Sequence, residues 1–252
     1  MCLHGVPTSS FLYRKLLKSL DEKGFRGIAI DFPGFGLSDR PADFNYSFQG
    51  FSEFIARAVK ILKLDKFHLV VHDAGGPPGF HFAAAHREKI KSLSILNTWI
   101  DVVNFKKPWM MKPLEFDLLG EIELKSINYY SWYIMFSKIG VLSSRQISNE
   151  EIAVYVDLLK RKDKGNAFLK FMRNYDDSAN FRNSCIPAIQ NTPYPVQLIW
   201  GAKDPALKAE KYIPEFQKFG SVDKTIKLPS RHLLQEEVYN EIARSIYELA
   251  QI

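Results

Sequence analysis

Cysteine is scarce in this sequence, whose 252 residues include only Cys2 and Cys185. Two thiols cannot form the disulfide framework of a small secreted protein, and they suit a reducing cytoplasm. The chain opens without a charged n-region or an apolar h-region, so no signal peptide is predicted. No apolar run approaches the roughly 18 residues that a membrane helix needs. We therefore expect a cytoplasmic protein that does not cross a membrane.

Dense blocks of one charge are also missing. The formal net charge is +6, but lysine and arginine are mixed with acidic residues, as at 87–89 and 241–244. Without a basic tract or a nucleic-acid motif, the excess is typical of a solvated surface, and no nucleic-acid partner is expected. The histidines lack metal-ligand spacing and no glycine-rich phosphate loop occurs, so neither a metal nor an organic cofactor is implied. The oligomeric state is left open.

Apolar residues make up 46% of the chain and aromatic residues 13%, enough for a sizeable core. Short apolar runs alternate with helical periodicity, a pattern that predicts a mostly parallel sheet flanked by helices, an α/β fold. Helices are expected near 48–64, 75–86 and 236–252. Strands are expected at 26–30, 67–72, 93–96, 196–200 and 224–228.

One long segment breaks this alternation. Residues 98–191 are rich in aromatic and helical patterns and poor in strand signals. We therefore predict a helical cap over 98–191, inserted between the first part of an α/β core at 1–97 and its second part at 192–252.

The sharpest local feature is the segment 71–76, Val-His-Asp-Ala-Gly-Gly, between a predicted strand and a predicted helix. This is the context of a nucleophile elbow, a tight turn that needs small residues around the nucleophile. Pro77 and Pro78 are tolerated in a first helical turn and support a helix start near Ala74. Serine usually occupies the elbow, whereas a carboxylate at Asp73 would attack an alkyl carbon and form an ester. An aspartate here would also serve as a plain helix N-cap.

Two residues near the carboxyl ends of later strands complete a candidate constellation. His232 lies between the last predicted strand and the final helix, where it would activate water. Asp204 directly follows the strand at 196–200 and would orient the imidazole. Taken alone, His232 would be a surface-loop histidine and Asp204 a turn former before Pro205. The backbone N–H groups of Val6, in the turn His-Gly-Val-Pro, and of Ala74 are candidates for an oxyanion hole.

These segments together resemble the haloalkane dehalogenase and epoxide hydrolase branch of the α/β-hydrolases, with haloalkane dehalogenases the most similar. The segments that carry the resemblance are 2–14, 31–41, 70–76 and 232–237. It extends over the first hundred residues and the last sixty or so, in the family's order of nucleophile, acid and histidine. The resemblance implies that Asp73 displaces a halide and that His232, oriented by Asp204, activates water. Asn97 stands where some members place an alternative acid, a role that an amide cannot fill.

Some positions depart from the family pattern. The usual tryptophan after the nucleophile is Ala74 here, and the usual asparagine of the His-Gly turn is Val6. Trp99, Trp109 or Trp132 would replace these halide donors and bind substrate, unless they are packing aromatics. For epoxides, the family uses two cap tyrosines. Tyr129, Tyr130 and Tyr133 lie in a suitable region, and Tyr130 is our candidate, but Met172 stands where the second tyrosine is expected.

The start of the chain is short for this family. The family's strand order places the strand before the His-Gly turn inside the sheet, between the strands ending near Ile30 and His72. Only Met1 to Leu3 are available to fill it, so we expect further strands to be missing and the sequence to be a fragment or to begin at a mis-assigned start.

The sequence thus predicts a hydrolase that acts on a small apolar substrate through an aspartyl-alkyl ester, similar to a haloalkane dehalogenase. The alternatives are an epoxide hydrolase and a binding or vestigial protein that keeps the pocket without turnover.

Overall fold

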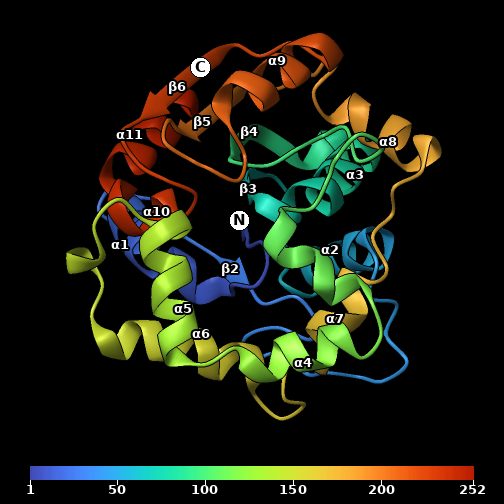
Figure 1. Cartoon of the computed structure of the whole chain (residues 1–252). Helices are drawn as coiled ribbons and strands as arrows, with labels where there is room; N and C mark the ends of the chain where they lie inside the picture. The colour runs from blue at the N-terminus through green and yellow to red at the C-terminus, as the bar shows by residue number, and fades with distance from the viewer.

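A six-stranded parallel sheet forms the centre of the computed structural model, which describes residues 1–252 apart from the side chain of Ser144. The strand order is β2-β1-β3-β4-β5-β6 (Figure 1). The strands are β1 (Cys2–Leu3), β2 (Ala29–Ile30), β3 (Phe67–His72), β4 (Ile90–Leu96), β5 (Val196–Gly201) and β6 (Lys224–Leu228).

Helices cover both faces of this sheet and fill the long connection between β4 and β5. Those around the sheet are α1 (Arg14–Asp21), α2 (Phe48–Ile61), α3 (Gly76–Ala85), α8 (Ala179–Cys185), α9 (Ala209–Phe219), α10 (Leu234–Glu237) and α11 (Tyr239–Leu249). The cap helices are α4 (Leu119–Ser126), α5 (Tyr129–Met135), α6 (Asn149–Lys160) and α7 (Asn166–Met172), with the 3-10 helix η4 (Trp109–Glu115) and the π-helix η5 (Phe136–Gly140). In Figure 1 the cap helices gather in green and yellow along the lower part of the view.

Strand β3 shows how the two faces are filled. Leu69 and Val71 belong to the larger apolar cluster, with α2 and α3, whereas Val70 belongs to the second cluster, with α1 and α11. All three are buried. A strand that is buried on both faces has an almost continuous run of apolar residues, and the sequence FHLVVH therefore predicted this strand. The strand thus carries its carboxyl end, at His72, into the middle of the molecule.

The structure confirms the predicted fold class and the predicted strands. β1 lies between β2 and β3, as expected, and pairs Leu3 with both Ile30 and Val71. The helix predicted over 236–252 is present as α11, but it begins later, because the backbone leaves the helical region at Val238 and separates α10 from α11. Helices α1 and α9 were not predicted.

The helix nearest the end of the predicted insertion lies apart from the cap. α8 packs against α3 beside the sheet, and the two run side by side in Figure 1. Helices α4 to α7 therefore form the part of the insertion that faces the carboxyl ends of the strands. Among the described residues, no helix is long and apolar enough to cross a membrane.

Candidate active site

The turn after β3 holds Asp73 in a strained conformation. Its φ is +48°, in the left-handed region that residues other than glycine rarely adopt. The neighbouring segment fixes this turn at both backbone groups: Asn97 O accepts from Asp73 N at 3.0 Å, and Thr98 Oγ1 donates to Asp73 O at 2.6 Å. The N-cap of α3 is Gly75. The Asp73 side chain therefore does not cap this helix.

Two glycines leave room for this turn. A Cβ on Gly5 would lie 2.3 Å from the Asp73 Cβ, and one on Gly75 would lie 2.4 Å from the carbonyl oxygen of His4. Real Cβ atoms do not approach other atoms so closely. The His-Gly turn and the elbow can therefore touch only because both positions lack side chains.

The three predicted polar residues come together at the carboxyl ends of three strands. Asp73 Oδ2 lies 3.4 Å from His232 Nε2, and Asp204 Oδ2 lies 2.8 Å from His232 Nδ1. The imidazole is thus held between two carboxylates, with one carboxylate at each ring nitrogen. This is the spatial arrangement of a nucleophile, a base and an orienting acid.

Backbone and amide donors hold the acid in place. Asp204 Oδ1 accepts from the N–H groups of Ala206 and Leu207 at 2.8 and 3.0 Å. Asn97 Nδ2 donates to Asp204 Oδ2 at 2.5 Å, and Asn97 Oδ1 accepts from Gly201 N at 2.8 Å. Asn97 therefore links β4 to β5 and orients the acid, a role that the sequence did not suggest.

The charges of the site stabilise one another. Burial disfavours an ionised Asp73, but the hydrogen bond and the charge of His232 outweigh it, so the pKa of Asp73 is lowered. Burial likewise opposes the charge of His232, but the attraction of Asp204 and Asp73 raises its pKa to about 10. At neutral pH the resting site therefore holds ionised Asp73 beside a protonated imidazole.

Both predicted oxyanion donors interact with the Asp73 carboxylate. Val6 N donates to Asp73 Oδ1 at 2.8 Å, and a backbone hydrogen bond from Ala74 also contributes to lowering the pKa of Asp73. Both N–H groups thus face the carboxylate oxygen that would carry negative charge when an ester on Asp73 is attacked.

An apolar cavity of about 540 Å³ opens above the triad and includes Asp73 and His232 in its wall. A volume of this order fits a small organic molecule. The predicted substrate residues Trp99, Trp109 and Trp132 line this cavity. Much of the remaining wall comes from the cap: Met111, Leu114, Ile139, Phe168 and Met172.

Tyr130, the remaining predicted substrate residue, is not among the lining residues. Its side chain is 77% exposed on the outer face of α5, whereas Trp132, two positions along the same helix, is buried. The prediction of Tyr130 as a substrate contact is therefore corrected, because residues two apart on a helix point in different directions.

Two indole groups in the cavity wall have no hydrogen-bond partner among the described residues. Trp99 and Trp132 are 1% and 3% exposed, and in both the Nε1 atom is buried without an acceptor. A buried N–H without an acceptor is unfavourable by about 1–3 kcal/mol. Both residues lie in the cavity wall, so a bound group that reached either N–H would satisfy it.

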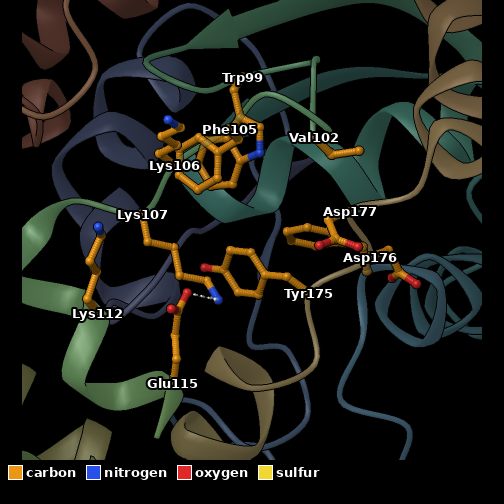
Figure 2. Close-up of a pocket in the computed structure, with 11 residues that line it drawn as sticks. Trp99, Val102, Phe105, Lys106, Lys107, Lys112, Glu115, Tyr175, Asp176 and Asp177 are labelled. Carbon is orange, nitrogen blue, oxygen red and sulfur yellow. Dashed lines mark ion pairs between the residues drawn. The ribbon is translucent and has the colours of Figure 1, made fainter.

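A second cavity of about 230 Å³ adjoins the first, and the two share Trp99, Phe105, Lys107 and Tyr175 in their walls. Figure 2 shows the Trp99 and Phe105 rings stacked and the Lys107 ammonium beside Glu115 and the Tyr175 ring. Lys107 Nζ lies 2.8 Å from Glu115 Oε1. No local pattern indicated Lys107 or Tyr175, because they meet only through the fold of the cap. Among the described residues, no group of three His, Cys, Asp or Glu side chains gathers to hold a metal ion.

Comparison with known proteins agrees with this geometry. The family described as alpha/beta hydrolase fold matches residues 1–238. The chain belongs to this family. It is 27% identical over 252 residues to haloalkane dehalogenase 2 of Mycobacterium tuberculosis, covering 97% of this chain and 85% of that protein.

Two solved α/β-hydrolase structures share the fold. Haloalkane dehalogenase DbeA from Bradyrhizobium elkani has a TM-score of 0.75 at 21% identity, with 99% of this chain and 88% of that chain covered. The epoxide hydrolase CorEH has a TM-score of 0.77 at 20% identity, with 98% and 89% covered.

Proposed function

We propose that this α/β-hydrolase cleaves carbon–halogen bonds of small apolar molecules through an ester on Asp73. One observation carries the proposal: the residue at the elbow is a carboxylate, ionised beside His232 and open to an apolar cavity. A carboxylate attacks a saturated carbon to give an ester that water can hydrolyse, whereas the serine of common esterases serves acyl transfer. The haloalkane dehalogenase relative supports the same reaction class.

In the first half of the reaction, an oxygen of Asp73 attacks the carbon that bears the halogen. The new C–O bond forms as the carbon–halogen bond breaks, and the halide leaves with the electron pair. A halide developing charge needs hydrogen-bond donors. The Trp99 and Trp132 indole N–H groups, which line the cavity without partners, supply them in place of the family's usual tryptophan and asparagine.

In the second half, His232 removes a proton from water, and the resulting hydroxide attacks the ester carbonyl of Asp73. Alkylation has by then neutralised Asp73, so the imidazole retains only the Asp204 carboxylate and releases its own proton more readily. The N–H groups of Val6 and Ala74 stabilise the oxyanion. Collapse releases the alcohol and regenerates the carboxylate, and the net products are alcohol, halide and a proton.

Halide release from a panel of brominated alkanes tests the proposal, with Asp73→Ala as the inactive control. His232→Gln should release halide once per molecule and then stop, and intact-mass analysis should find the alkyl group on Asp73. If neither wild type nor His232→Gln forms an adduct with any bromide or epoxide, the chain is a binding protein that retains the pocket without turnover, and the proposal fails.

Epoxide opening is the second candidate, and Tyr175 favours it. This tyrosine lines the cavity. Burial, with the Asp73 and Glu115 carboxylates, raises its pKa well above the ordinary value. A protonated phenol can donate to an epoxide oxygen as Asp73 opens the ring. Diol formation from styrene oxide, lost in Tyr175→Phe while bromide release continues, would establish this second activity.

A further inference from the structure

The loop that carries His232 is hydrogen-bonded directly to the cap. His232 N donates to Ile139 O at 3.3 Å, and Leu233 N donates to Gly140 O at 2.8 Å. Both acceptors belong to the π-helix η5, which ends at Gly140. The last carbonyls of a helix have no partner within the helix, so the histidine loop supplies the donors that this helix end lacks.

Arg231 extends the same contact. Its Nη1 donates to Ser137 O at 2.6 Å and to Val141 O at 3.1 Å. One guanidinium therefore spans two carbonyls of the helix end from the position before the catalytic histidine.

Glu237 holds the segment after η5 from the other end of the histidine loop. Its Oε1 accepts from Leu142 N at 2.7 Å and from Ser143 N at 3.1 Å, and its Oε2 accepts from Arg231 N at 3.4 Å. Arg231 and Glu237 thus bracket residues 137–143, and we call these two side chains with that segment the base clamp.

The clamp lies at the reaction cavity and acts on the histidine backbone. Lys138 and Ile139 of η5 line the cavity together with His232. The His232 carbonyl accepts from His72 Nε2, 2.9 Å away, on the side of the elbow. The histidine backbone is therefore held by the cap through its N–H and by the core through its carbonyl.

We propose that Arg231 and Glu237 are positioning residues that tie the placement of His232 to the cap, so that ester hydrolysis depends on the cap being seated. The inference rests on the proposed function, because it concerns the base of its second half-reaction. Attack by Asp73 does not use His232 as a base. Loosening the clamp should therefore slow hydrolysis of the ester and leave its formation unchanged.

Rapid-quench measurements on Glu237→Ala, Glu237→Gln and Arg231→Gln separate the two steps. With a brominated alkane, the first halide burst reports ester formation, and the following steady rate reports hydrolysis. We expect Glu237→Ala and Arg231→Gln to keep the burst rate within about twofold while hydrolysis slows by about 10- to 100-fold, so that adduct accumulates on Asp73. Glu237→Gln keeps an acceptor for Leu142 and Ser143 and should recover most of the rate.

Arg87→Gln is the matched control, because Arg87 also donates to two carbonyls, those of Gln190 and Asn191, but lies before β4, at the end away from the site. It should leave both steps unchanged. The burst amplitude counts folded active sites, so partial unfolding of a variant does not distort the ratio. Equal slowing of both steps, or no slowing of hydrolysis, would overturn the clamp.

A readout independent of turnover separates this inference from the proposed function. Amide hydrogen exchange should quicken at His232 and Leu233 in Arg231→Gln and Glu237→Ala but not in Arg87→Gln. If the wild type forms no adduct, the proposed function fails, and the exchange data still decide whether the clamp holds the loop. If exchange is unchanged in both variants, the clamp is refuted whatever the wild type does.

Discussion

The elbow and the cap border the same cavity but differ in whether their polar groups already have hydrogen-bond partners. At the elbow, backbone contacts to Val6, Asn97 and Thr98 and the absence of side chains at Gly5 fix Asp73. In the cap and its approach, the indole N–H groups of Trp132 and Trp99 have no partner among the described residues. The core thus fixes the reacting atoms before substrate arrives, whereas two indole donors of the cavity wall are left without an acceptor. Substitutions in the core should abolish the reaction, whereas substitutions in the cap should alter which substrates react.

The largest effect is expected from Asp204→Asn, which tests the core. The amide keeps the shape but cannot hold the imidazole in its working tautomer or stabilise its charge, so ester hydrolysis should fall by about 10³-fold or more. Single-turnover halide release should change far less, and its ratio to steady turnover is the measurement. Equal loss of both steps would show that Asp204 supports the nucleophile and not the base.

Gly5→Ala tests the packing of the core around the nucleophile. The new methyl group would meet the Asp73 side chain, so we expect a loss of about 1–3 kcal/mol in unfolding free energy and at least a tenfold loss of single-turnover halide release. Chemical denaturation and rapid-quench kinetics measure the two. Gly24→Ala is the control. The space around Gly24 is open, although its φ of +82° adds backbone strain, so stability should fall without loss of activity in the folded fraction. Full activity in Gly5→Ala would contradict the tight fit.

Removing one indole donor tests the cap side of the comparison. Trp132→Phe and Trp99→Phe should each lower the single-turnover rate with bromoalkanes by about 10- to 100-fold. Stability should fall modestly, because the packing lost with the larger ring outweighs the removal of an unsatisfied N–H, so rates are compared per folded molecule. Trp109→Phe is the comparison within the cavity wall: this tryptophan also lines the cavity but is 80% exposed, so a smaller loss is expected. If all three variants behave alike, the indoles are packing aromatics, and other groups stabilise the leaving atom.

The pH dependence of stability tests the charges that the core holds together. The folded pKa of His232 is raised to about 10 from the ordinary 6.5, so its favourable interactions are fully present below pH 6.5 and are lost as the pH rises through 10. The unfolding free energy of wild type relative to His232→Gln should therefore decline between pH 6.5 and 10. A difference that stays flat between pH 6.5 and 10 would show that the imidazole is neutral in the folded protein.

Local chemistry in the sequence was sufficient for much of the core. The run at 67–72 is apolar because β3 is buried on both faces, and proline is well tolerated in the first turn of a helix such as α3, so the elbow could be predicted from the sequence. Asp204 and His232 followed from their positions after strands, because parallel strands bring their carboxyl ends to one edge. Helix α9 was missed, with Pro214 in its interior, and Val238 breaks a pattern that reads as one continuous helix.

By itself, the sequence predicted the strands of the sheet and the three residues of the candidate triad, because these depend on short local patterns. Only the tertiary structure decided that Asn97 orients Asp204, that Tyr130 faces outward while Tyr175 and Lys107 face the cavity, and that Arg231 and Glu237 hold η5. Each of these contacts joins segments far apart in the chain, and the packing of the cap against the core, which no local pattern encodes, sets their distances.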